Sequence, residues 1–276
     1  MDEQRLKTFA NQIRIETLKS LSHLGFGHFG GSLSIVEALA VLYGAVMKVD
    51  PKNPQWQARD YFVLSKGHGG PALYATLALK GYFPVEQLLT LNQNGTLLPS
   101  HPDRLKTLGV DATTGSLGQG VSIAAGIALS HQLRGLPNRT FCIVGDGELN
   151  EGQCWEAFQF IAHRRLTHLC LLVDFNKQQL DGNLTDIIHP FDLSDKFTAF
   201  GFRVVTVKGD DIQQLYYVLS EPPKDKPLVV ILDSVKGQGV PYLEGLPNCH
   251  HLRLTEEIRR EINRAIEVLE AENARL

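Results

Sequence analysis

Two short apolar runs, each followed by a polar turn, constrain this chain more than any other feature. Residues 140–144 lead into Gly145-Asp146-Gly147, and the wholly apolar residues 169–173 lead to Asn176. A short apolar run bounded by turn residues is typical of a strand buried on both faces of a parallel sheet. Ligands bind at the carboxyl ends of such strands, so Asp146 and Asn176 are expected at one binding edge.

The order of predicted strands and helices along the whole chain indicates a doubly wound α/β fold, with a mostly parallel sheet flanked by helices. Further strands are expected at 61–64, 203–207 and 228–232, and helices at 3–22, 71–80, 117–133, 153–163 and 211–219. Ser34 followed by Glu37 resembles a capping box and predicts a helix over 35–47.

The C-terminal residues 255–276 are expected to form an amphipathic helix. Thr255 is placed as its N-cap, and Ile258, Ile262, Ile266 and Leu269 recur along one face. With no internal repeat, residues 1–276 are interpreted as a single domain.

Composition excludes several classes of function. The net charge is −3 and no block of Lys and Arg occurs, so a nucleic-acid partner is not expected. No uninterrupted apolar run approaches the length of a membrane span, and the charged start is unlike a secretory signal. The 4 cysteines show no CxxC spacing, which favours reduced thiols and a cytoplasmic protein.

The glycines after the strand at 140–144 do not fit a nucleotide fingerprint. In Gly145-Asp146-Gly147 the third glycine of G-x-G-x-x-G is missing, an acidic side chain occupies the turn, and GxxxxGK[ST] is absent from the chain. A carboxylate there repels a phosphate unless a divalent cation lies between them, and Asp146 and Asn176 offer oxygen ligands for that cation. Either residue alone also fits an ordinary turn. The pair after two consecutive strands favours a metal–diphosphate site.

Four loops rich in glycine or proline each carry a histidine. They are His28, His68, His101 and His250, the last followed directly by His251. Histidine titrates near neutral pH and can donate or accept a proton, so this set indicates proton handling around a polar substrate if the loops converge.

Three ordered motifs resemble the transketolase family. They are the runs at 62–68 (FVLSKGH) and 113–120 (TTGSLGQG), followed by the Asp146–Asn176 pair. The resemblance runs from the first helix to His250, but only over the family's diphosphate-binding domain. It implies the thiamine diphosphate-binding fold and the N-terminal subunit of a split transketolase. A separate C-terminal, pyrimidine-binding subunit would complete it, as an α2β2 assembly that transfers a two-carbon ketol unit from a ketose, or ketose phosphate, to an aldose.

By the resemblance, thiamine diphosphate and Mg²⁺ (or Ca²⁺) are the cofactors. The implied metal ligands are the side chains of Asp146 and Asn176 and the carbonyl of Gln178. The implied cofactor contacts are His68, Gly115, Ser116, Leu117, Gly147, Asn176 and His250. The implied catalytic residues are His28 and His101 at the donor sugar, His250, and Glu151, which links paired active sites across the dimer.

Two positions depart from the family pattern. Phe29 stands where proline is usual, beside the donor site, and Cys249-His250-His251 replaces the usual Trp-His-Gly. The metal pair is shared with other thiamine diphosphate enzymes, so the diphosphate-binding subunit of a 2-oxo acid dehydrogenase or of a specialised carboligase is an alternative. A catalytically inactive partner is another. His28, His68 and His101 favour a transketolase.

Overall fold

A computed structural model of the protein describes residues 1–180 and 182–276 and contains a parallel sheet of five strands. The strand order is β2-β3-β4-β8-β7, and all neighbours in it run parallel. The strands are β2 Tyr61–Leu64, β3 Thr140–Gly145, β4 Leu169–Phe175, β7 Arg203–Lys208 and β8 Leu228–Asp233. The five predicted strands and their parallel pairing are therefore confirmed.

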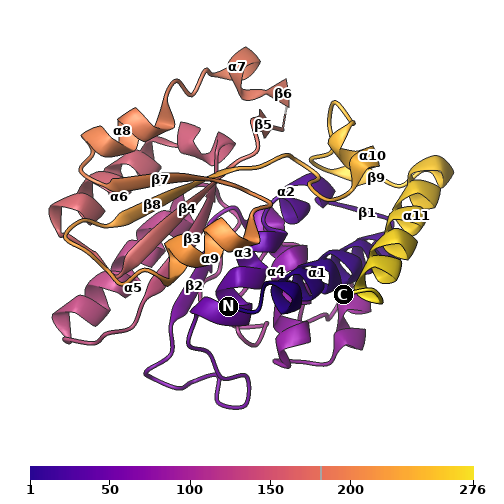
Figure 1. The fold of residues 1–276 in the computed structure, drawn as a ribbon, viewed down its shortest axis with the longest axis horizontal. Coiled ribbons are helices and arrows are strands. Elements are labelled where there is room, and N and C mark those ends of the chain that lie inside the picture. The colour runs from indigo at the N-terminus through magenta and orange to yellow at the C-terminus, as the bar shows by residue number, and fades with distance from the viewer. Residues whose placement is uncertain (181) are drawn as a thin grey trace.

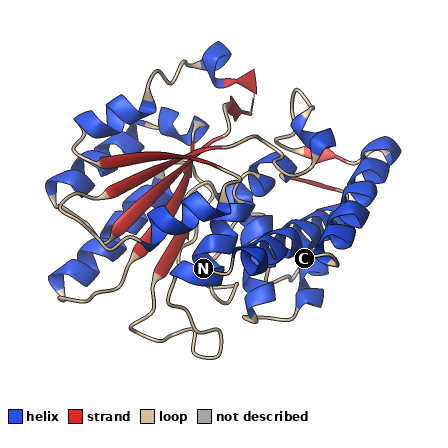
Figure 2. Cartoon of the chain, viewed as in Figure 1, coloured by secondary structure: helices blue, strands red, loops and turns tan. Residues whose placement is uncertain are grey.

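Helices cover both faces of this sheet (Figure 1, Figure 2). Strand residues alternate between two hydrophobic clusters: Phe141 and Ile143 of β3 pack in one, and Cys142 and Val144 in the other. This alternation follows from the period of two along a strand, and it confirms the doubly wound architecture. The first cluster lies against α1 (Glu3–Leu24), α3 (Val36–Val41), α4 (Gly70–Lys80), α9 (Ile212–Ser220) and α11 (Glu256–Asn273), the second against α5 (Gln119–Leu133), α6 (Gly152–His163) and α8 (Leu193–Ala199).

The helix predicted over 35–47 is confirmed, because α3 continues into a π-helical turn, but the predicted Ser34 cap is wrong. The segment forms α2 (Phe29–Leu33), α3 and a π-helical turn η1 (Leu42–Val46), and Ile35 rather than Ser34 precedes α3. The Ser34 hydroxyl donates instead to Asp174 at 2.7 Å, and Glu37 bonds the Arg14 guanidinium. Buried charges need partners, and these long-range bonds outweigh a local cap.

The two ends of the chain meet beside the sheet. Thr255 caps α11 as predicted, its hydroxyl accepting from the Ile258 N–H at 3.2 Å. A short antiparallel pair joins β1 (Phe26–Gly27) to β9 (Leu252–Arg253). His28 directly follows β1 and His251 directly precedes β9, so this pairing brings their loops together.

Three further features bear on the sequence expectations. Within the described residues, one segment has the length and hydropathy of a membrane span: Phe29–Val46, with mean hydropathy 1.6, is 83% buried inside the protein, as a core segment is.

All four cysteines, Cys142, Cys154, Cys170 and Cys249, are buried and free. Beyond the end of β4 lie a small hairpin, β5 (Gln178–Gln179) with β6 (Gly182–Asn183), and α7 (Leu184–Ile187).

Candidate active site

The site lies at the carboxyl edge of the sheet, where β3 and β4 end side by side. Gly145 pairs with Asp174 in register, so the turns carrying Asp146 and Asn176 leave the sheet at the same level. They open onto a pocket of about 250 Å³. Its lining consists of His28, Lys66, His68, His101, Gly115, Leu117, Gly145, Asp146, Gly147, Glu148, Asn176, Gln178, Gln179, Leu180, Lys236 and His250.

Most of the residues predicted from the sequence meet in this pocket. The predicted histidines His28, His68, His101 and His250 all line it, as do the three predicted metal ligands. Ser116 and Glu151 do not line it, and both are exposed to solvent in the single chain. The convergence of the four histidine loops is therefore confirmed.

Asp146 and Asn176 are held by bonds that fix their orientation. The Asp146 carboxylate accepts from the Gly147 N–H at 2.8 Å and from the Lys177 N–H at 2.7 Å. The Asn176 amide nitrogen donates to Asp174 at 2.8 Å, which leaves its oxygen as the free end, accepting weakly from the Gln178 N–H at 3.2 Å. Lys177, between Asn176 and Gln178, has φ of 66°, so the backbone adopts the left-handed conformation directly after Asn176.

The Asp146 carboxyl is buried beside a second carboxylate, that of Asp174. Burial, and then the neighbouring Asp174 carboxylate, raise its pKa to about 7. Across the part of the chain that the structure describes, no three His, Cys, Asp or Glu side chains gather as a metal site. A cation here would instead take one carboxylate, amide and carbonyl oxygens, and oxygens from a ligand, which suits a hard ion such as Mg²⁺.

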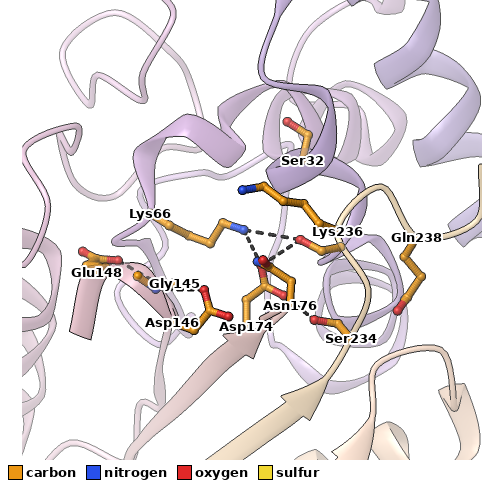
Figure 3. A network of polar contacts seen from close by, with 12 residues as sticks. Ser32, Lys66, Gly145, Asp146, Glu148, Asp174, Asn176, Ser234, Lys236 and Gln238 are labelled. Carbon is orange, nitrogen blue, oxygen red and sulfur yellow. Dashed lines mark hydrogen bonds and ion pairs between the residues drawn. The ribbon is translucent and has the colours of Figure 1, made fainter. Parts of the chain in front are cut away.

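A buried charge network supports the Asn176 side chain (Figure 3). Lys66 and Asp174 form an ion pair with 0% exposure of either side chain. Asp174 also accepts from Ser234 at 2.6 Å and from Ser34 at 2.7 Å. Burial alone would raise the pKa of Asp174, but Lys66 and these hydroxyl donors outweigh it and hold the pKa below its usual value.

Sequence reasoning missed this network. A charged residue at the end of an otherwise apolar strand requires a buried partner, and that signal marks Asp174. Lys66 stands 108 residues earlier, so the sequence alone does not identify it as the partner. Lys236 was missed as well; it lines the pocket and donates to the Gln178 carbonyl at 3.3 Å.

The histidine rings form one cluster around His28. Its ring centroid lies 5.7 Å from that of His68, 5.8 Å from His101, 5.3 Å from His250 and 4.8 Å from His251. Burial, followed by the charges of neighbouring imidazoles and lysines, lowers the pKa of His28 to about 4 and that of His250 to about 3. Both rings are therefore neutral at pH 7 and able to donate and accept hydrogen bonds.

Glu148 joins the glycine turn to the loop before α5. It is 2% exposed and accepts from Ser65 at 2.5 Å, the Gly118 N–H at 2.7 Å and the Gly145 N–H at 3.0 Å. The Leu117 carbonyl accepts from the Gln153 amide at 2.8 Å and retains a second lone pair toward the pocket it lines.

Two buried polar atoms around the pocket have no hydrogen-bond partner among the described residues. They are Nδ1 of His250 and Nε2 of Gln179. Leaving a buried donor or acceptor unpaired costs about 1–3 kcal/mol, so each atom has an unused hydrogen-bonding capacity that a polar ligand could satisfy. Gly147 keeps this wall open, because a Cβ there would lie 2.7 Å from the Gln179 Cβ.

The family model for the thiamine diphosphate binding domain of transketolase matches residues 5–269. A 6-deoxy-6-sulfo-D-fructose transketolase subunit of Clostridium sp. (strain MSTE9) is 50% identical and covers 99% of this chain and 100% of that protein. One of the apulose-4-phosphate transketolase subunits, from Actinobacillus succinogenes, is 40% identical over 91% of each chain.

Solved transketolases have the same fold. That of Campylobacter jejuni aligns with a TM-score of 0.86 and 28% identity, and it covers 100% of this chain and 48% of that one. That of Leishmania mexicana aligns with a TM-score of 0.85 and 29% identity, over 98% of this chain and 45% of that one. The chain thus spans about half the length of these enzymes and nearly the full length of its subunit relatives. It belongs to the transketolase family, as the thiamine diphosphate-binding subunit of a split transketolase.

Proposed function

We propose that this chain, with a pyrimidine-binding partner subunit, transfers a two-carbon ketol unit from a ketose donor to an aldose acceptor. The observation that carries the proposal is the pocket that neutral imidazoles line together with the buried Asp146 and Asn176. A sugar presents several hydroxyls, and neutral rings that both donate and accept can bind them and exchange protons with them.

The donor set fits a divalent cation that carries a diphosphate. Asp146, the oxygen of Asn176 and the Gln178 carbonyl would hold Mg²⁺ (or Ca²⁺), with diphosphate oxygens and water completing its coordination. The raised pKa of Asp146 supports this role, because a nearby cation would stabilise the ionised carboxylate. When bound, thiamine diphosphate supplies the carbanion that accepts and releases the ketol unit.

The remaining pocket residues position that cofactor. Gly147 and the side chains of His68, His250 and Asn176 would contact its diphosphate end, and the unpaired Nδ1 of His250 supports this assignment. The loop Gly115-Ser116-Leu117 would meet the aminopyrimidine, with the Leu117 carbonyl as acceptor.

The donor sugar would lie against His28 and His101. Their rings are 5.8 Å apart between centroids, which allows both to contact adjacent hydroxyls of one substrate. As neutral groups they would hold the protons that move to and from the sugar oxygens. Glu151, exposed in the single chain, is proposed to pair with its counterpart across the dimer.

The second subunit would supply the pyrimidine-binding half of the site. Relatives that match this chain end to end are named as subunits, which supports a separate partner and an α2β2 assembly. We propose that residues 1–276 form one domain of that assembly. A cytoplasmic location is proposed because all four cysteines are free thiols.

The donor is proposed to be a ketose with an anionic terminal group. The relatives act, by their names, on 6-deoxy-6-sulfo-D-fructose and apulose 4-phosphate, which carry a sulfonate and a phosphate. The test mixes this chain with the product of the neighbouring reading frame that resembles the remaining transketolase domains. Ketose phosphate, ketose sulfonate and pyruvate are then compared as donors. Ketol transfer from either anionic ketose is expected, whereas turnover of pyruvate alone would assign a 2-oxo acid enzyme.

A further inference from the structure

The segment 184–191, beyond the β5–β6 hairpin, carries exposed apolar side chains close to the active site. Ile187 is 41% exposed, Ile188 56% and Phe191 71%. Figure 1 places α7 and the hairpin beyond the carboxyl ends of the strands, away from α1 and α11. An isolated apolar side chain on a surface is ordinary, but three within five residues at the rim of the site require a reason.

Phe191 also has an unfavourable backbone. Its φ is 51°, in the left-handed region, which is a genuine outlier for a bulky residue. Local contacts hold it there: the Phe191 N–H donates to the His189 ring at 2.8 Å, the two rings lie 4.8 Å apart, and the Lys196 ammonium lies 5.5 Å from the aromatic centroid. The chain therefore fixes an aromatic ring in a solvent-exposed position, and such strain is found at binding sites.

Backbone contacts connect this segment to the proposed metal ligands. The Leu184 N–H donates to the Lys177 carbonyl at 2.9 Å, and the Lys177 N–H donates to Asp146 at 2.7 Å. Leu180, 56% exposed, lines the active-site pocket itself. A subunit that completes the pocket must therefore cover Leu180, and the surface continues from there to Phe191.

From this continuity we propose that Ile187, Ile188 and Phe191 form a docking surface for the pyrimidine-binding partner subunit, with Phe191 as its anchor. The proposal rests on the proposed function. The described residues around this surface carry Asp186, Asp192 and Asp195, and Lys196 lies against the Phe191 ring. The partner surface should accordingly be an apolar pocket for Phe191 with a polar rim.

The test titrates the partner, defined as the polypeptide that restores ketol transfer, into the chain loaded with thiamine diphosphate and Mg²⁺. Binding is measured by calorimetry and by the partner concentration that gives half-maximal activity. Phe191→Ser and Phe191→Gly should each weaken binding at least about tenfold, as loss of a buried aromatic anchor does. Glycine adopts the φ of this position without strain, so the Phe191→Gly chain should melt no lower than wild type.

Leu133→Ser is the matched control. Leu133 is equally exposed at 71%, but it lies at the end of α5, at the opposite edge of the sheet. Its substitution should leave partner affinity unchanged. Wild-type affinity in both Phe191 variants, with ketol transfer intact, would overturn the docking surface and leave the proposed function standing.

Two other outcomes also contradict the proposal. If no polypeptide restores ketol transfer to the wild-type chain, the proposed function fails and this surface loses its occupant. If the chain alone dimerises in light scattering and Phe191→Ser abolishes that dimer, the surface belongs to a second copy of this chain.

Discussion

Replacing the buried Asp146 carboxylate should make the metal-free chain more stable, although it removes a proposed metal ligand. The pKa of Asp146 is raised from 3.8 to about 7 by burial and by Asp174. A shift of about 3 units corresponds to about 4 kcal/mol of destabilisation at pH 8, where the folded chain must hold the ionised form. Asp146→Asn removes that charge with little change of shape.

Asp146→Asn also introduces a hydrogen-bond mismatch, which reduces the gain in the free energy of unfolding. The carboxylate accepts from two backbone N–H groups, of Gly147 and Lys177, and an amide can accept from only one of them. Leaving one buried N–H facing an amide nitrogen costs about 1–3 kcal/mol. The net gain is therefore about 2 kcal/mol, or about 4–8 °C in melting temperature for a chain of this size.

The direction in which the stability difference between the two proteins changes with pH tests whether the buried charge of Asp146 causes it. A carboxyl whose folded pKa is raised contributes stability at low pH and loses it as the pH rises through about 7. At pH 5 the destabilisation of wild type by the buried Asp146 charge falls to about 1.6 kcal/mol. This is comparable with the cost of the hydrogen-bond mismatch in Asp146→Asn, so the two proteins should have similar melting temperatures. Above pH 7 Asp146→Asn should melt higher.

The assay is thermal melting in EDTA at pH 5 and pH 8, repeated with Mg²⁺ and thiamine diphosphate. The added ligands should raise the melting temperature of wild type but not of Asp146→Asn. Asp210→Asn, at an exposed carboxylate, is the control and should match wild type throughout. An Asp146→Asn chain that melts below wild type by the same amount at both pH values would refute the argument from a buried, uncompensated charge.

Three further predictions concern the pocket. His101→Ala should lower kcat of the complex about a hundredfold or more and change the dissociation constant of thiamine diphosphate only about threefold, because a proton-handling group acts on the sugar; equal losses would make His101 structural. Gly147→Ala should weaken thiamine diphosphate binding in calorimetry at least about tenfold, because its Cβ would lie 2.7 Å from that of Gln179; unchanged affinity would contradict the close approach. The His28 ring, with its pKa lowered to about 4, should show no NMR titration between pH 5 and 8. Since only the unfolded chain takes up that proton, His28 should reduce stability as the pH falls from 6.5 toward 4; a midpoint near 6.5 in the folded chain would refute its burial.

Local patterns predicted the sheet and its binding edge. The apolar runs before Asp146 and Asn176 are typical of strands buried on both faces of a parallel sheet, so the parallel direction of these strands followed from sequence, whereas the strand order did not. The four histidine loops were likewise identifiable, because glycine and proline mark turns at strand ends.

Features that depend on distant partners could not be predicted. Ser34 has a cap-like sequence, but its hydroxyl bonds Asp174, 140 residues away. The position of His251 against His28 depends on the pairing of β1 with β9. Strands of two residues are too short to give a recognisable sequence pattern. The left-handed backbone of Phe191 has no glycine or asparagine to signal it.

The most direct test of a divided active site is a mole-ratio titration of ketol transfer. The chain is held at a fixed concentration with thiamine diphosphate, Mg²⁺ and an anionic ketose, while the pyrimidine-binding polypeptide is added. Activity should be zero without it and should rise to a plateau at an equimolar ratio. Robust ketol transfer by the chain before any partner is added would contradict the account.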